Sequence, residues 1–346
     1  MNCCINCFTS SYLISIINGD DRTGTCDFCS TTNTSIYSAR ELSDFFRNIL
    51  SLYVPDENST SQISESLKED FNVISEIVVS PIELLKAIFE DEIEDFEPIF
   101  NGNVSLKRRP FLETQADNIH NVWNEFKEEI KFVNRYHIQN TIDLKKLETF
   151  FLHESFYRNI KKGRIFFRCR VSDINGFPCE KMGNPPIELA SSGRANPKGI
   201  SYLYVADSLE TSMYETRASL FDYVTVGEFK LTEDIKILNL RNPKDDPIYW
   251  SEIEEIENYL IYIPFIQTLQ KELSLPIRKR DQILDYIPTQ YISEFIKSLG
   301  FDGVEYQSSL NSEGYNIAIF NPEKLECFKT NVYEIKNIKL THGKIK

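Results

Sequence analysis

Two pairs of cysteines near the N-terminus are the first residues whose spacing suggests chemistry. Two residues separate Cys4 from Cys7, and two separate Cys26 from Cys29. Each pair can sit on a turn that aims two thiolates at one ion, and tetrahedral zinc takes four such ligands. The spacing predicts a closed, structural Zn²⁺ site with no open position for a substrate. Cys3 leaves the register open, because it could replace Cys4.

A second group of candidate residues lies in the middle of the chain. A loop rich in Gly, Pro, Asn and Ser, residues 178–199, contains Arg194 and Asn196, and Tyr204 and Glu215 follow it. Arginine suits a pyrophosphate because its planar fork makes paired hydrogen bonds. A tyrosine can stack on a flat heterocycle, and a carboxylate can stabilise positive charge that develops on a sugar carbon. Taken singly, each residue is equally typical of an ordinary surface or core.

The elements that must position these residues differ between the two halves of the chain. Up to about residue 160 the pattern is mainly helical, including segments 115–138 and 142–159. Beyond it, alternating apolar residues predict strands at 164–171, 200–206, 223–230, 235–240, 302–306 and 315–320. Helices are predicted at 251–262 and 289–299, and another, capped by Asp207 with Glu210, carries Glu215.

This pattern predicts an α+β protein with three parts. We expect a zinc-ribbon-like module in residues 1–40, a mainly helical region in 41–160 and a mixed α/β domain in 161–346.

Composition limits the class of protein and its partners. The chain has 346 residues and a formal net charge of −14, which disfavours nucleic-acid binding because the phosphate backbone repels an acidic protein. Its longest apolar stretches are shorter than the ~18–20 residues of a membrane span, and the N-terminus lacks the pattern of a secretory signal. We therefore expect a cytoplasmic protein without a membrane partner.

The run GRANPKGISYLYVADSLETSMYETR, residues 193–217, resembles the RES domain family, which is named for its Arg, Glu and Ser. Arg194 and Glu215 occupy two of these positions. The third is Ser308, in the run YQSS, with Ser309 as the neighbouring possibility. Arg168 matches an early strand arginine of the family, and the resemblance covers residues 163–335.

The first half is similar to the N-terminal domain that is often fused to RES domains, the HEPN/RES N-terminal domain. The similarity lies in the cysteine pairs and the helix that follows them, from Cys26 to Leu42.

The resemblance implies a fold like that of ADP-ribosylating toxins, with a split mixed sheet around an NAD cleft. RES proteins include toxins of toxin–antitoxin pairs that deplete NAD⁺ by phosphorolysis or hydrolysis. Carried onto this sequence, Arg194 and Arg168 would hold the pyrophosphate, and Tyr204 would contact the nicotinamide end. Glu215 would support the oxocarbenium-like ribose, and Ser308 would orient the ribose or amide. Asn196, in the same loop as Arg194, is a further candidate for NAD⁺ binding.

The expected enzyme is therefore an NAD⁺ phosphorylase or NAD⁺ glycohydrolase, with NAD⁺ as substrate and phosphate or water as acceptor. The alternatives are a mono-ADP-ribosyltransferase that modifies a protein, and a noncatalytic interaction protein that binds a nucleotide. An antitoxin or another protein regulator is an expected partner.

Overall fold

The computed structural model describes residues 1–241, 246–250, 252–275 and 283–338. The chain forms two compact units, Met1–Asn121 with Lys244–Phe265, and Val122–Pro243 with Ile266–Lys346. Two long helices, α6 (Arg109–Phe132) and α9 (Ile253–Ser274), contribute residues to both units. The domain boundaries predicted above, 1–40, 41–160 and 161–346, stay a prediction.

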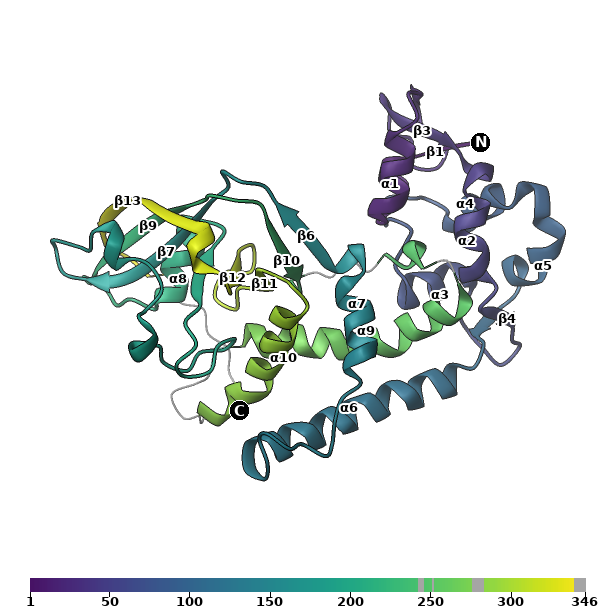
Figure 1. The fold of residues 1–346 in the computed structure, drawn as a ribbon. Helices are drawn as coiled ribbons and strands as arrows, with labels where there is room; N and C mark the ends of the chain where they lie inside the picture. The colour runs from purple at the N-terminus through teal and green to yellow at the C-terminus, as the bar shows by residue number, and fades with distance from the viewer. Residues whose placement is uncertain (242–245, 251, 276–282, 339–346) are drawn as a thin grey trace. The chain divides into compact units, whose positions relative to one another are not determined.

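The unit that holds the N-terminus combines short strands with short helices (Figure 1). In one sheet β3 pairs with both β1 and β2, and in another β4 pairs with β5. The strands are β1 (Asn2–Cys4), β2 (Thr23–Gly24), β3 (Thr34–Ser38), β4 (Tyr53–Pro55) and β5 (Val104–Leu106). The helices are α1 (Ser11–Asn18), α2 (Ser43–Leu50), α3 (Ile63–Asp70), α4 (Pro81–Ile88) and α5 (Ile93–Asn101).

The other unit is built on a large mixed sheet, with the strand order β13-β9-β7-β8-β12-β11-β10-β6. β10 and β11 are parallel, and the other neighbours are antiparallel. The strands are β6 (Tyr157–Ile160), β7 (Ile165–Ser172), β8 (Leu203–Ala206), β9 (Tyr223–Leu231), β10 (Ile235–Asn239), β11 (Gly303–Gln307), β12 (Tyr315–Ile319) and β13 (Leu325–Glu334). The helices that belong to this unit alone are α7 (Leu144–Leu152), α8 (Leu209–Thr216) and α10 (Ile287–Ser298). The predicted fold class, α+β with a mixed sheet in the C-terminal part, is confirmed.

The large sheet is nearly divided between β7 and β8. β7 pairs with β9 along its whole length, from Ile165 to Ser172. With β8 it pairs at a single position, where Phe167 lies opposite Ala206. Because neighbouring strands normally satisfy each other's N–H and C=O groups, two strands that diverge leave backbone groups available between them. The gap between β7 and β8 is therefore a place where side chains or a ligand can enter the sheet.

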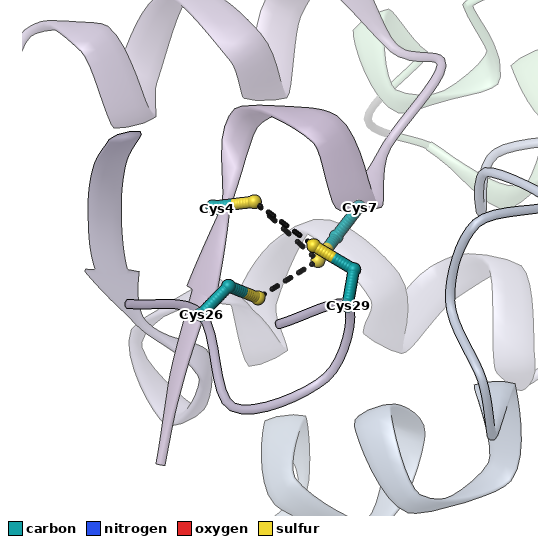
Figure 2. A group of neighbouring side chains, drawn as sticks. All are labelled: Cys4, Cys7, Cys26 and Cys29. Atoms are coloured by element: carbon teal, nitrogen blue, oxygen red, sulfur yellow. Dashed lines mark hydrogen bonds between the residues drawn. The ribbon is translucent and has the colours of Figure 1, made fainter. Parts of the chain in front are cut away.

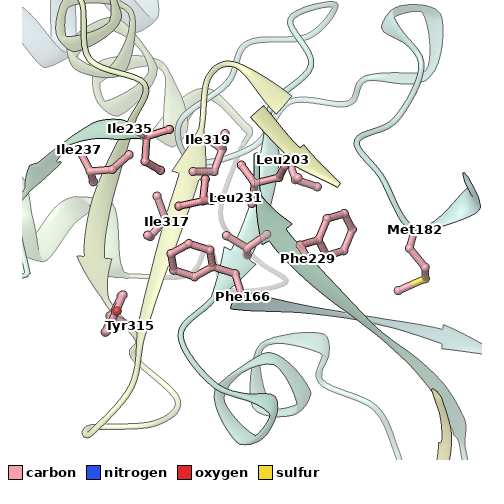
Figure 3. Packing of buried hydrophobic residues seen from close by; sticks show 12 residues of the cluster. Phe166, Met182, Leu203, Phe229, Leu231, Ile235, Ile237, Tyr315, Ile317 and Ile319 are labelled. Atoms are coloured by element: carbon pink, nitrogen blue, oxygen red, sulfur yellow. The ribbon is translucent and has the colours of Figure 1, made fainter. Parts of the chain in front are cut away.

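One face of this sheet carries the hydrophobic core of the unit (Figure 3). The core residues come from strands on both sides of the gap and from the loop after β7: Phe166, Met182, Leu203, Val205, Phe229, Leu231, Ile235, Ile237, Tyr315, Ile317, Ile319 and Leu325. Successive residues of a strand face opposite sides. Since Leu203 and Ile317 belong to the core, Tyr204 and Asn316 lie on the opposite face. Polar residues of β8 and β12 are thereby collected on the face away from the core.

α8 packs against β7, β8 and β9, and so it lies over the gap. Its N-cap is Ser208, whose hydroxyl accepts a hydrogen bond from the N–H of Thr211 at 3.1 Å. The prediction that Asp207 caps this helix is wrong, because the Asp207 carboxylate accepts instead from the N–H of Tyr315 at 3.1 Å. The helix ends at Thr216, and its C-cap Arg217 has the left-handed φ of 51°.

Three elements differ from the sequence prediction. The segment 142–159 was expected to be helical throughout, but α7 ends at Leu152 and β6 begins at Tyr157, where it pairs with β10. α9 continues past Pro264 to Ser274, whereas the prediction ended at residue 262 and its first residue, 251, lies outside the described residues. β13 was not predicted. The bounds of these elements depend on which strand pairs with which and on the surfaces that pack together. A local sequence pattern does not contain this information.

Within the described residues, every helix is too short or too polar to cross a lipid bilayer.

We expect Ile317→Ala to destabilise the large sheet by about 2–5 kcal/mol, because it removes methylene groups from a fully buried position. The free energy of opening can be measured from the urea dependence of amide exchange in the strands. Ile187→Ala is the matched control, since Ile187 is 66% exposed, and it should change this value by less than about 0.5 kcal/mol. Equal losses in the two variants would contradict the position of Ile317 in the core.

Candidate active site

A cleft of about 350 Å³ lies at the gap between β7 and β8. This volume falls within the roughly 300–1,000 Å³ of typical small-molecule sites. Its walls come from both sides of the gap, from α8 and from the loop before β8: Phe167, Arg168, Cys169, Gly193, Arg194, Tyr204, Val205, Ala206, Ser212, Glu215, Thr216, Tyr286, Tyr306 and Asn316. The charged side chains of this lining are two arginines and one glutamate.

Glu215, near the end of α8, is held by donors from the other half of the sheet. Its Oε1 accepts hydrogen bonds from the Ser308 hydroxyl at 2.7 Å and from Nδ2 of Asn316 at 2.9 Å. Its Oε2 lies 3.7 Å from Nη2 of Arg194. A carboxylate with three such partners has a fixed orientation inside the cleft.

Ser308 is itself oriented by the backbone of the turn that follows β11. Its oxygen accepts hydrogen bonds from the N–H groups of Leu310 at 3.2 Å and Asn311 at 3.1 Å. Since these donors point at the hydroxyl oxygen, the hydroxyl proton is free to face Glu215. The neighbouring Ser309 is exposed. Of the two serines that the sequence left open, the structure therefore places Ser308 against the carboxylate.

Arg194 lies in the loop before β8 and is largely buried, with a side-chain exposure of 13%. Besides its ion pair with Glu215, it donates from Nη1 to the carbonyl of Ser274, at the end of α9, at 3.3 Å. Its guanidinium carbon lies 5.8 Å from the centre of the Tyr306 ring. The structure thus brings together Arg194, Glu215 and Ser308, which come from three separate segments of the chain.

Tyr204 also lines the cleft, but its hydroxyl is fully engaged by the loop that carries Arg194. It accepts from the N–H of Ala195 at 3.1 Å and donates to Oδ1 of Asn196 at 2.7 Å. Burial, the largest effect, raises the pKa of Tyr204 to about 12. The Tyr204 hydroxyl is un-ionised, and it both donates and accepts a hydrogen bond within the loop. The oxygen therefore holds the loop in place, while the ring can contact a ligand.

Asn196 points into the loop. Its Nδ2 lies 2.8–3.2 Å from the carbonyls of Ser191, Pro197 and Ile200, and its exposure is 4%. A Cβ on Gly193 would collide with Asn196 Oδ1 and Tyr204 Oη, so this wrapping requires a glycine at position 193. The role of Asn196 in NAD⁺ binding stays a prediction, and the contacts show it as an organiser of the loop.

Arg168 reaches across the gap from β7. Its Nη1 donates to the carbonyl of Tyr204 at 3.1 Å, a group that a fully paired β7 would otherwise satisfy. Its buried Nε has no hydrogen-bond partner among the described residues. Burial, followed by the charge of Arg170, lowers the pKa of Arg168 to about 10, so the side chain remains a cation at neutral pH. A partly buried cation whose Nε donor is unused favours an anionic ligand.

Several residues of the site were not assigned a role from the sequence. Asn316 bonds Glu215, Tyr306 lies beneath Arg194, and Tyr286 lines the cleft. The sequence held a signal for one of them, because Asn316 interrupts an otherwise apolar strand, and a polar residue in such a place usually has a bonded partner. Tyr306 and Tyr286 carry no comparable signal, since aromatic residues are typical of a core.

Two family models match parts of this chain. Residues 180–336 match the family described as RES domain. The chain carries a RES domain. Residues 19–143 match the family described as HEPN/RES N-terminal domain 1.

Among solved structures, a chain of the M. tuberculosis MbcT–MbcA toxin–antitoxin complex is similar over 55% of this chain and 91% of its own length, with 13% identity and a TM-score of 0.30. No curated protein matches the chain.

The matched RES region contains Arg194, Tyr204, Glu215 and Ser308, whereas Arg168 precedes it. The strand β7 that carries Arg168 is nevertheless paired with β9 inside the same sheet. The sheet that contains the matched residues therefore also includes strands that lie before them.

The N-terminal cysteines form a second candidate site, for a metal ion (Figure 2). The Sγ atoms of Cys4, Cys7, Cys26 and Cys29 all lie within 4.8 Å of one another. The pairs Cys4–Cys29 and Cys7–Cys26 are 3.4 and 3.3 Å apart. Sulfurs around a tetrahedral zinc with Zn–S bonds of ~2.3 Å lie about 3.8 Å from one another, so the four thiols fit one such ion.

Cys3 lies outside this group. Its Sγ donates to the carbonyl of Tyr37 at 3.4 Å, on the neighbouring strand β3. Cys3 and Cys4 are consecutive residues of β1, so their side chains face opposite sides of the strand. This alternation explains why Cys4 joins the cluster and Cys3 does not.

We expect Cys4→Ser to lower the bound metal of the purified protein well below one equivalent, because a serine hydroxyl does not replace a thiolate ligand. Elemental analysis of protein prepared under reducing conditions measures this. Cys3→Ser is a closely matched control, since it alters a neighbouring buried thiol that faces the other way. Equal metal content in the two variants would contradict the ligand set.

Proposed function

We propose that the RES domain binds NAD⁺ in the cleft between β7 and β8 and breaks the bond between nicotinamide and ribose. The observation that carries this proposal is the Glu215 carboxylate, fixed by Ser308, Asn316 and Arg194 at the wall of a cleft of about 350 Å³. Membership of the RES family supports NAD⁺ as the substrate, in line with the resemblance described above.

The proposed reaction needs little acid–base chemistry. The nicotinamide of NAD⁺ is a cationic leaving group, and it takes the electron pair of the C1′–N bond as it departs, which makes it neutral. Positive charge then develops on the ribose carbon. A fixed carboxylate nearby stabilises this charge more in the transition state than in the ground state, which is the requirement for a faster reaction. Glu215 is the residue proposed for this role.

The two arginines have different electrostatic environments and suit different tasks. Arg194 is already balanced by Glu215, whereas Arg168 has no carboxylate within salt-bridge distance among the described residues. We assign both to the pyrophosphate of NAD⁺, with Arg168 as the cation that the ligand neutralises. Tyr204, whose ring lines the cleft, is proposed to contact the nicotinamide end.

The reaction ends when an acceptor oxygen bonds to C1′. Inorganic phosphate would give a sugar phosphate, whereas water would give ADP-ribose and release a proton. Depletion of cellular NAD⁺ by either route would make the protein a toxin, and a cognate inhibitor and a cytoplasmic location are part of this proposal.

We further propose that the four-cysteine cluster holds one Zn²⁺ with a structural role, because four thiolates leave tetrahedral zinc no open position.

We expect Glu215→Gln to lower the rate of nicotinamide release by at least about 100-fold, because the amide keeps the shape of the side chain and loses its charge. Chromatography of free nicotinamide measures the rate, and circular dichroism checks the fold. Glu210→Gln, on the exposed first turn of the same helix, is the control and should keep full activity. Wild-type turnover by Glu215→Gln would remove the basis of the proposal.

We also expect the purified protein to release nicotinamide from NAD⁺ without any added protein target, because the residues around Glu215 all come from this chain. Mass spectrometry of the product, with and without phosphate, identifies the acceptor as phosphate or water. Release that depends on an added protein, with ADP-ribose attached to that protein, would instead establish a transferase.

A further inference from the structure

Side chains of α10 make hydrogen bonds to the loop that carries Arg194. The Nε2 of Gln290 lies within hydrogen-bond distance of three acceptors in this loop: Ser192 Oγ at 2.7 Å, the Gly193 carbonyl at 2.7 Å and the Asn196 carbonyl at 3.0 Å. The preceding residue, Thr289, has its Oγ1 2.7 Å from the carbonyl oxygen of Arg194 and 3.0 Å from that of Tyr286, and its one hydroxyl proton can be donated to either. One turn of α10 thus places two donor side chains against acceptors of residues 192–196.

These contacts are shielded from water. Gln290 is 6% exposed and Thr289 is 4% exposed. Leaving a buried carbonyl without a hydrogen-bond donor costs free energy. The conformation of the loop therefore depends on the side chains of Gln290 and Thr289. α10 also packs against β11, the strand that bears Tyr306 beneath the Arg194 guanidinium. The helix therefore holds the backbone of the Arg194 loop and packs on the strand that bears Tyr306.

We propose that Gln290 is a positioning residue for Arg194, and that through it α10 sets the affinity of the cleft for its anionic ligand. The kinetic part of this inference rests on the proposed cleavage of NAD⁺. Gln290 does not line the cleft, so it acts through the loop and makes no contact with substrate. The hydroxyl of Tyr204, on β8, bonds to Ala195 and Asn196 on one side of this loop. The contacts from α10 hold its other side.

The chemistry of the side chain gives a sharp test. Two of the three partners of Gln290 Nε2 are carbonyl oxygens, which can only accept. Gln290→Glu keeps the size and replaces the donor by a carboxylate that these oxygens repel. Gln290→Met keeps the length and removes the donor without adding charge. Ser293→Ala is the matched control, because Ser293 is fully buried on the same helix and its hydroxyl bonds within the helix, to the Thr289 carbonyl.

We expect both Gln290 variants to lower kcat/KM for NAD⁺ by about 10–100-fold, mainly through a higher KM. The reason is that a loop without its Gln290 contacts holds the Arg194 guanidinium slightly out of its binding position. Ser293→Ala should match the wild type. In an Arg194→Ala background, Gln290→Met should have no further effect, since the residue acts through Arg194. Additive losses in this double-mutant cycle, or a lower kcat with unchanged KM, would overturn the inference.

Amide hydrogen exchange tests the positioning without any enzymatic activity. The N–H of Gly193 donates to the Asn196 carbonyl at 2.9 Å and the N–H of Ala195 donates to Tyr204, so both should be protected in the wild type. Both Gln290 variants should speed exchange at these two amides about tenfold or more and leave β8 and β12 unchanged. Unchanged exchange would overturn the role of Gln290. If exchange changes and wild-type protein leaves NAD⁺ intact, the proposed function fails while the positioning role stands.

Discussion

The division of the large sheet is the constraint on which the site depends. β7 and β8 meet at one paired position, Phe167 with Ala206, although β7 is fully paired with β9 on its other side. Strands that separate in this way leave backbone groups without partners, and the sequence supplies Arg168 to satisfy the carbonyl of Tyr204. The same separation opens the cleft. The partly buried Arg168 and the ligand-sized space therefore have one structural cause.

The charges of the site are distributed across this division. Arg168 comes from the half with β7, whereas the donors that orient Glu215 come from β12 and from the turn after β11. α8 carries Glu215 and packs on strands of both halves, so the carboxylate lies where their side chains can meet. Polar groups inside a cleft need partners, and Ser308, Asn316 and Arg194 supply them to the Glu215 carboxylate. An anionic ligand would be the corresponding partner for the Arg168 guanidinium.

The residues around the cleft divide into those that face a ligand and those that hold them in place. Glu215, Arg194 and Arg168 line the cleft directly. Gln290 on α10 and Asn196 within the loop do not line it, and they hold the Arg194 loop in place. Tyr204 belongs to both groups, because its ring lines the cleft and its hydroxyl holds the loop. The four cysteines belong to the other compact unit, and a tetrahedral zinc held by four thiolates would have no open position for a substrate. Stability and chemistry are thus assigned to separate sets of residues.

Sequence patterns identified the types of residue and most strands of the RES domain, because alternation and capping are local signals. They could not show which partners meet, since Ser308 and Glu215 are 93 residues apart and Gln290 and Gly193 are 97 apart. Contacts of this kind follow from strand order, which also explains why β6 within a helical prediction and the unpredicted β13 were missed. The choice between Cys3 and Cys4, like that between Ser308 and Ser309, depends on which side of the backbone each residue faces. Consecutive residues of a strand point to opposite sides of the sheet. Two neighbouring residues of the same type are therefore indistinguishable from the sequence until the strand pairing, or the turn that orients them, is known.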